Sequence, residues 1–315
     1  MVRRFKITFL FKISIIITLI LTGSNFDQAQ QLNSPRPDDT VKLRVNMIDL
    51  NVAVLDPYGR AVRGLTKDNF EVYEDKTKQN IDLFSSGDAP VSIGFVFDLS
   101  GSMAAKAGRA RDALREFINA SNPDDEMFLI GFNNKARLLN DFTKRDSEIL
   151  NSVAMMPAAG MTALYDAVYM GIEKLKQGRN KRKVLFVISD GQDNQSRYTD
   201  KEIRNLIKES DIEIFSIGTT AIWQYITLDD YEGMVLLDDL GRMSGGTAYF
   251  PRDFNEMSRA CLQIATQIRN QYSLAYVPTN STFDGKWRKL RIRIKGMVNR
   301  GYVVLRSRDG YYARP

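Results

Sequence analysis

The chain has 315 residues, of which 43% are hydrophobic and 26% are charged. This composition is typical of a globular protein with room for one sizeable domain and a smaller one. The sequence contains no histidine and a single cysteine, Cys261. These counts exclude a Ser-His-Asp or Cys-His nucleophile, a zinc site with histidine ligands, an intrachain disulfide and a CxxC redox pair.

The first 29 residues have the pattern of an export signal, since Arg3, Arg4 and Lys6 form a basic region ahead of the apolar run Ile13–Leu21. That run is too short to span a hydrocarbon core of ~30 Å by itself. Extended back to residue 7 it approaches spanning length, so an uncleaved membrane anchor stays open as an alternative. We therefore expect an exported protein of the periplasm, the cell envelope or the extracellular space, with membrane contact only if this segment is retained.

Loss of residues 1–29 would remove four basic residues and one acidic residue, so the formal net charge of +6 would become +3. A balance this close to neutral gives no electrostatic reason to expect nucleic-acid binding. Basic clusters at 179–183 and 288–293 are expected to be solvated loops and strand faces. We therefore expect no nucleic-acid partner.

Two β-rich extensions frame the middle of the chain. After a polar linker at 30–40, residues 41–88 show period-two alternation and turn residues, which predict an N-terminal β extension. The β pattern returns in a C-terminal extension over 271–315. The predicted strands are Val41–Val54, Phe70–Tyr73, Ile81–Phe84, Tyr272–Val277, Lys289–Ile294 and Tyr302–Leu305. Neither extension has enough strands to bury a face alone, so we expect the two to pack together as one accessory β unit.

Between residues 89 and 270, short buried apolar runs alternate with helical periods. The predicted strands are Ile93–Phe97, Met127–Phe132, Val184–Ile188 and Ile212–Ile217. The predicted helices are Ala107–Asn119, Ala163–Lys176, Asp200–Glu209, Leu228–Met243 and Phe254–Arg269. Strands separated by helices imply right-handed crossovers. The expected fold class is α/β, with a doubly wound, mostly parallel sheet of the Rossmann type and the accessory β unit beside it.

Polar loops directly follow two of the predicted strands. Asp98, Ser100 and Ser102 follow the first, and Asp190 follows the third. Ligands of open parallel sheets bind beyond the carboxyl ends of the strands, so these loops are expected to face one site. A third loop supplies Thr162 where a helix begins. Two carboxylates and three hydroxyls, without nitrogen or sulfur, suit a hard cation such as Mg²⁺ or Mn²⁺ rather than zinc or copper.

Each of these residues also has a purely local interpretation. Asp98 and Ser100 could satisfy backbone donors in a turn and a helix N-cap, Thr162 could cap the following helix, and Asp190 could belong to an Asp-Gly turn. However, three polar loops, which carry Asp98, Thr162 and Asp190, occur in chain order at the places expected for one site. This coincidence favours metal binding. A degenerate, metal-free site stays open. We expect Asp166 to brace its helix rather than bind a metal.

The order Asp-x-Ser-x-Ser, Thr and Asp-Gly resembles the metal-ion-dependent adhesion site of von Willebrand factor A-type domains. This resemblance implies that Ser100 and Ser102 bind the metal directly, that Thr162 binds it directly or through water, and that Asp98 and Asp190 act through water or hydrogen bonds. It also implies a ligand position left for a carboxylate of a partner. The expected protein partner therefore presents Asp or Glu.

Four further segments look like a bacterial exported "VWFA-related" family, in which an A-type domain is framed by N- and C-terminal β extensions. They are Gly64–Asp75, Ala89–Gly94, Gln271–Pro278 and Arg308–Tyr312. The resemblance implies an envelope or secreted location and a metal-dependent binding face. The stretch Thr219–Tyr231 looks longer than the fold requires and is expected near the metal end, where it could influence the choice of partner.

We therefore expect a non-enzymatic, adhesion-type binding module. One alternative is a hydrolase or phosphoryl-transfer enzyme that uses the same cation as a Lewis acid. Without histidine, its general base would have to be Asp98, Asp190 or Asp193. The other alternative is a structural envelope protein whose site is silent.

Overall fold

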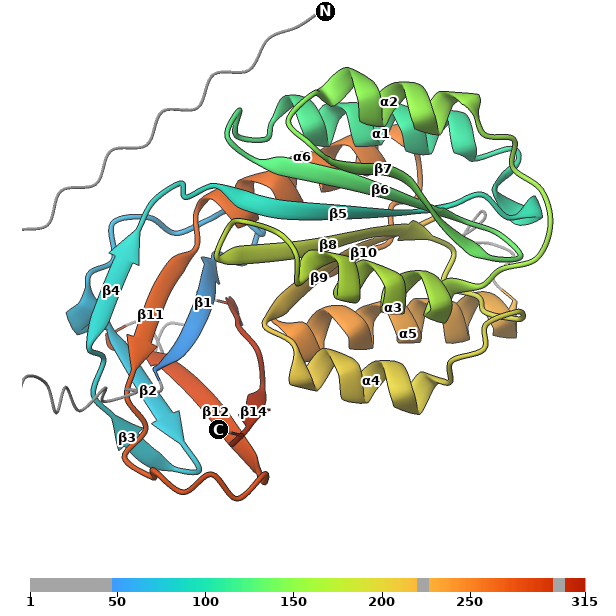
Figure 1. The fold of residues 1–315 in the computed structure, drawn as a ribbon. Helices are drawn as coiled ribbons and strands as arrows, with labels where there is room; N and C mark the ends of the chain where they lie inside the picture. Colours follow the sequence, from blue (N-terminus) through green and yellow to red (C-terminus); the bar gives the residue numbers. More distant parts are fainter. Residues whose placement is uncertain (1–46, 220–226, 297–303, 315) are drawn as a thin grey trace, which may run out of the picture. The chain divides into compact units, whose positions relative to one another are not determined.

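The computed structural model describes residues 47–219, 227–296 and 304–314 (Figure 1). The predicted signal or anchor, the linker and the start of the first predicted strand lie outside these residues, as does most of the long loop Thr219–Tyr231. No helix within the described ranges combines the length and the apolar character needed to cross a bilayer.

A six-stranded sheet forms the centre of residues 91–249. Its order is β10 (Ala248–Tyr249), β9 (Ile212–Gly218), β8 (Arg182–Ser189), β5 (Val91–Asp98), β6 (Glu126–Phe132) and β7 (Ala136–Thr143). All neighbours pair in parallel except β6 and β7, which are antiparallel. The predicted doubly wound, mostly parallel sheet is thus confirmed.

Helices cover both faces of this sheet (Figure 1). One face carries α1 (Ala107–Asn119), α2 (Asp146–Met155) and α6 (Phe254–Arg269), and the other carries α3 (Leu164–Leu175), α4 (Asp200–Glu209) and α5 (Leu228–Ser244). Strands β5, β6 and β9 are buried along their whole length, and β8 is buried at every residue except Lys183. This two-sided burial explains why they appear in the sequence as continuous apolar runs rather than as alternating patterns.

Helices α1, α4 and α6 have the bounds predicted from the sequence. The start of α4 is fixed by a capping box, in which the Thr199 hydroxyl accepts from the Glu202 backbone N–H and the Glu202 carboxylate accepts from Thr199. Asp253 caps α6 through the Glu256 backbone N–H at 2.8 Å. Helix α5 ends at Ser244, at the predicted glycine stop.

The prediction missed four strands and one α-helix: β3 (Thr77–Gln79), β7, α2, β10 and β14 (Gly310–Tyr312). Strand β7 lies at the edge of the sheet, is mostly half-buried or exposed, and its pairing with β6 shifts register twice. Helix α2 buries only Ile149 and Val153, which is too little to produce a clear helical period. The strand predicted over Ile81–Phe84 lies two residues later, at β4 (Leu83–Ser86).

The two β extensions form two four-stranded antiparallel sheets. One has the order β13 (Val304–Arg306), β1 (Ile48–Leu55), β11 (Tyr272–Tyr276) and β4, and the other has the order β14 (Gly310–Tyr312), β12 (Trp287–Ile294), β2 (Phe70–Glu74) and β3 (Thr77–Gln79). Their inner faces share one hydrophobic core, to which both extensions contribute. The expected accessory β unit, built from both ends of the chain, is therefore confirmed.

One buried carboxylate lies within that core. The Oε2 atom of Glu74 accepts hydrogen bonds from the hydroxyls of Tyr276, at 2.6 Å, and Tyr311, at 2.8 Å. Glu74 is 2% exposed. Burial raises the pKa of both tyrosine hydroxyls, so they remain donors to the carboxylate at neutral pH. These bonds join β2 of the N-terminal extension to β11 and β14 of the C-terminal extension.

Candidate metal centre

The residues predicted to form the site lie at the point where the sheet changes winding direction. Asp98 is the last residue of β5, and Asp190 follows Ser189, the last residue of β8. These strands are parallel neighbours, and the chain continues from β5 to β6 on the opposite side. Crevices of this kind, at the carboxyl ends of strands, are where open α/β sheets bind ligands.

Hydrogen bonds join four of the five candidate residues, Asp98, Ser100, Ser102 and Asp190. The Ser102 hydroxyl donates to Asp190 Oδ2 at 2.6 Å, and the hydroxyl oxygens of Ser100 and Ser102 are 3.1 Å apart. The Ser100 backbone N–H donates to Asp98 Oδ1 at 2.8 Å. Ser102 is exposed, whereas Ser100 is buried. The group therefore extends from the sheet interior to the surface.

Asp98 is fully buried, with 0% exposure. Its second oxygen, Oδ2, accepts from the Ser189 hydroxyl at 2.7 Å. Desolvation raises the pKa of Asp98 to about 6, although the hydrogen bonds from Ser100 and Ser189 act in the opposite direction. The ammonium of Lys106, 3.9 Å from Asp190 Oδ2, is a nearby positive charge that the sequence did not reveal.

Thr162 differs from the other four residues, because its hydroxyl has no hydrogen-bond partner among the described residues. Its side chain does not cap a helix: α3 begins at Leu164, and the N-cap residue is Ala163. This excludes the helix-cap interpretation of Thr162. The residue is only 4% exposed. The hydroxyl is not among the buried unpaired side-chain atoms of the described residues, so a ligand at the surface of the site can reach it.

Backbone contacts hold the Thr162 loop against the two other loops. The Gly101 N–H donates to the Gly160 carbonyl at 2.9 Å, which joins the turn after β5 to the loop before α3. The Asn194 side-chain oxygen accepts from the Thr162 N–H at 2.9 Å, and the Asn194 N–H donates back to the Thr162 carbonyl at 3.0 Å. All three loops are thus tied to one another.

The sequence missed two positioning residues. Asn134, just after β6, accepts the Met161 N–H on its Oδ1 atom at 2.6 Å, and nothing in its sequence context marks it. Asn194, on the loop after β8, holds Thr162 in place by accepting its backbone N–H. Asp166 braces the loop before α4, because it accepts the backbone N–H groups of Arg197 and Tyr198.

The local interpretations account for only part of the site. Asp98 does satisfy a backbone donor in the turn, and Asp190 Oδ1 accepts the Gln192 N–H at 3.3 Å. They do not account for the Thr162 hydroxyl or for the contact between the two serine hydroxyls. No group of three or more His, Cys, Asp or Glu side chains that could hold a metal occurs in the described ranges. The donors gathered here are oxygen atoms only, and they fit a hard divalent cation.

Helix α5 approaches the Asp190 turn at backbone contact distance. A Cβ atom built on Gly233 of α5 would lie 2.5 Å from the carbonyl oxygen of Asp190, and one built on Gly191 would lie 2.3 Å from the carbonyl oxygen of Gly233. Gly191 also has a φ of +85°, a conformation that favours glycine. The position of Asp190 is therefore set by close packing of two glycines.

Comparison with known families agrees with this geometry. Residues 93–192, which contain all five candidate residues, match the family model of the von Willebrand factor type A domain. The chain carries a von Willebrand factor type A domain. No curated protein matches the chain.

The solved structures that resemble this chain include three bacterial proteins. A D319A mutant of the PilB minor pilin from Streptococcus sanguinis is 15% identical, with a TM-score of 0.49, and the match covers 58% of this chain and 62% of that one. The chain thus matches less than two-thirds of that pilin. The vWF domain of the type V pili tip protein Mfa5 from Porphyromonas gingivalis is 13% identical, with a TM-score of 0.48 and coverage of 57% and 95%. A von Willebrand factor type A protein from Catenulispora acidiphila is 11% identical, with a TM-score of 0.49 and coverage of 87% and 75%.

Proposed function

We propose that the A-type domain is a metal-dependent protein-binding module of an exported protein, and that it recognises an Asp or Glu side chain of its partner. The observation that carries the proposal is the Thr162 hydroxyl, which forms no hydrogen bond within the described residues and lies on a loop tied by hydrogen bonds to the Ser100, Ser102 and Asp190 cluster. The basic and apolar N-terminal segment supports an envelope or secreted location.

The residues that would hold Mg²⁺ or Mn²⁺ are Ser100, Ser102 and Thr162, supported by Asp98 and Asp190. A bound hard cation would supply a concentrated positive charge to which a carboxylate can bind. Because the three hydroxyls are neutral, only the two buried aspartates offset that charge. Such a site keeps an affinity for an additional anionic oxygen, which a partner's acidic side chain can provide.

Exposed apolar side chains near the candidate metal centre support a protein as the partner. Met161, next to Thr162, is 46% exposed. The first turns of α5, whose Gly233 touches the Asp190 turn, carry Leu228 and Tyr231, which are 71% and 59% exposed. Apolar groups around a polar centre are typical of protein docking surfaces.

The hydrogen bonds of the carboxylates favour binding over hydrolysis. A general base must reach the proton that it removes. Asp98 is fully buried, and both of its oxygens accept hydrogen bonds. Asp190 is 1% exposed and accepts from Ser102 and Gln192, while Asp193 accepts from the Tyr165 N–H and from Ser196. We therefore propose a non-enzymatic role.

A pull-down from an envelope extract tests this function, with the full chain and its Thr162→Val variant each used in Mg²⁺ and in EDTA. The hydroxyl of Thr162 has no partner among the described residues, so valine should leave the fold intact while it removes one oxygen donor. We expect a partner to be recovered only by the unaltered chain in Mg²⁺. Equal recovery in all four samples would contradict metal-dependent binding, and substrate turnover lost in EDTA would favour the hydrolase.

A further inference from the structure

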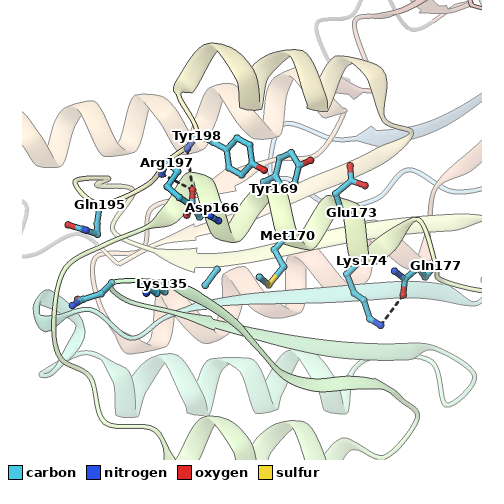
Figure 2. Close-up of a pocket in the computed structure, with 12 residues that line it drawn as sticks. Lys135, Asp166, Tyr169, Met170, Glu173, Lys174, Gln177, Gln195, Arg197 and Tyr198 are labelled. Carbon is cyan, nitrogen blue, oxygen red and sulfur yellow. Dashed lines mark hydrogen bonds and ion pairs between the residues drawn. The ribbon is translucent and has the colours of Figure 1, made fainter.

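A groove of about 630 Å³ lies along α3, between this helix and the residues that lead into β7 (Figure 2). Its walls include Lys135, Tyr169, Met170, Lys174 and Arg197. The size lies within the range of sites that enclose a small ligand or a few peptide side chains. None of the five residues of the candidate metal centre lines this groove.

One end of the groove is continuous with the candidate metal centre. Asn134 and Gln195 line the groove and also contact the Thr162 loop. Asn134 Oδ1 accepts the Met161 N–H at 2.6 Å, and the Gln195 N–H donates to the Thr162 carbonyl at 3.1 Å. This end of the groove therefore adjoins the loop that carries Thr162.

The walls combine aromatic and apolar groups. The rings of Tyr169 and Tyr198 are stacked, with centroids 4.0 Å apart and an interplanar angle of 12°. Met170 projects from the next position of α3 and is half-buried (Figure 2). These side chains offer a surface against which an aromatic or long aliphatic side chain can pack.

The charge that remains available in the groove is positive. The acidic residues are already engaged: Asp166 pairs with Arg197 at 3.1 Å, and Glu173 pairs with Lys176 at 2.5 Å. Lys135 is exposed and has no ion-pair partner in the described part of the chain. The side chain of Arg197 is 84% exposed despite its contact with Asp166. Lys135 is therefore the cation of the groove that an acidic ligand can complement.

We propose that this groove binds the segment of the partner that adjoins the acidic residue held at the metal centre. The bound segment is an extended peptide with an aromatic or long aliphatic side chain against Tyr169 and Met170 and a second acidic side chain near Lys135. Met170 lies six positions after Leu164, the first residue of α3, which corresponds to about 9 Å along the helix axis. An extended peptide covers this distance with about three residues. The apolar side chain is therefore expected about three or four residues from the metal-bound acid. This inference rests on the proposed function.

A displayed library of linear peptides with one fixed Asp and randomised flanks tests the proposal. Peptides are selected on the immobilised full chain in Mg²⁺ and eluted with EDTA, so that only metal-dependent binders are recovered. We expect the recovered peptides to share an apolar side chain at one fixed distance from the Asp, together with a second acidic residue. Peptides that share no flanking preference would overturn the groove proposal and leave metal-dependent binding intact.

Charge reversal at the groove provides the second measurement. Lys135→Glu should weaken binding of a selected peptide about tenfold, while the heat of Mg²⁺ binding stays unchanged. Lys67→Glu, an exposed lysine of the N-terminal β extension outside the groove lining, is the matched control and should bind as the unaltered chain does. If Lys135→Glu bound the peptide with the same affinity as the unaltered chain, the inference would be overturned. Failure to recover any peptide with EDTA would overturn both this inference and the proposed function.

Discussion

Replacing Gly233 by alanine should destabilise the protein, although alanine is the better helix former. Gly233 lies inside α5, where this substitution ordinarily stabilises a helix by about 1 kcal/mol. Here the added Cβ would lie 2.5 Å from the Asp190 carbonyl oxygen and 3.0 Å from the Gly191 carbonyl carbon. Both are backbone atoms, so the strain cannot be relieved by rotation of a side chain. Either α5 or the Asp190 turn must move.

The size of the effect follows from two opposing terms. Overpacking a close contact costs about 1–3 kcal/mol, and contact with backbone atoms favours the upper end of that range. After the helical gain of about 1 kcal/mol, the free energy of unfolding should fall by about 2 kcal/mol. The turn that moves carries Asp190, which accepts from Ser102 at 2.6 Å. Mg²⁺ affinity should therefore fall about tenfold, as is usual when a residue that orients metal ligands is displaced.

Denaturant unfolding in EDTA and calorimetric titration with Mg²⁺ would measure the two effects separately. Gly108→Ala is the matched control, because Gly108 is also helical and has no atom within 4 Å of the added Cβ. It should stabilise the protein by as much as about 1 kcal/mol and leave Mg²⁺ binding unchanged. If Gly233→Ala stabilised the protein as Gly108→Ala does, the close approach of α5 to the Asp190 turn would be wrong.

Three further predictions concern the site and the accessory β unit. In EDTA, Thr162→Val should change the free energy of unfolding by less than about 0.5 kcal/mol. Its Mg²⁺ affinity should fall at least about tenfold. A large loss of stability in thermal unfolding would instead indicate a structural role for the hydroxyl. Mg²⁺ at a hundred times its dissociation constant should stabilise the folded chain by about 2.7 kcal/mol. The resulting difference in melting temperature between Mg²⁺ and EDTA should disappear in Ser102→Ala, and a difference that persists would locate the ion elsewhere. Tyr276→Phe removes one of the two hydroxyl donors to the buried Glu74 carboxylate. Denaturant unfolding should therefore show a free energy of unfolding that is lower by about 1–3 kcal/mol. Unchanged stability would mean that the carboxylate finds another donor.

The sequence predicted the elements whose signals are local. Helices α4 and α6 have polar caps and amphipathic periods, and their bounds were predicted to the residue. The central strands were recognisable because burial on both faces requires continuous apolar runs. Strand β7 and helix α2 were missed because their burial is partial, so their sequences carry only a weak period. Strand β7 packs against β6, and α2 packs against α1 and β7, so both elements form through tertiary contacts.

In the candidate site, too, some features could be predicted from the sequence and others could not. Asp98, Ser100 and Ser102 are close in the chain, and with Asp190 they follow recognisable strands, so their proximity could be predicted from topology. The contact of Asn194 with Thr162, however, spans 32 positions. Such a contact depends on how the loops fold over one another, and no local pattern encodes it. The approach of Gly233 to the Asp190 turn was hidden for the same reason.

Calorimetric titration of the full chain with Mg²⁺, repeated with Thr162→Val, tests the central claim most directly. The unaltered chain should show saturable heat with a stoichiometry of about one ion, and the Thr162 variant should bind at least about tenfold more weakly. No heat with Mg²⁺ or Mn²⁺, or the same affinity in both proteins, would contradict a cation held by these hydroxyls.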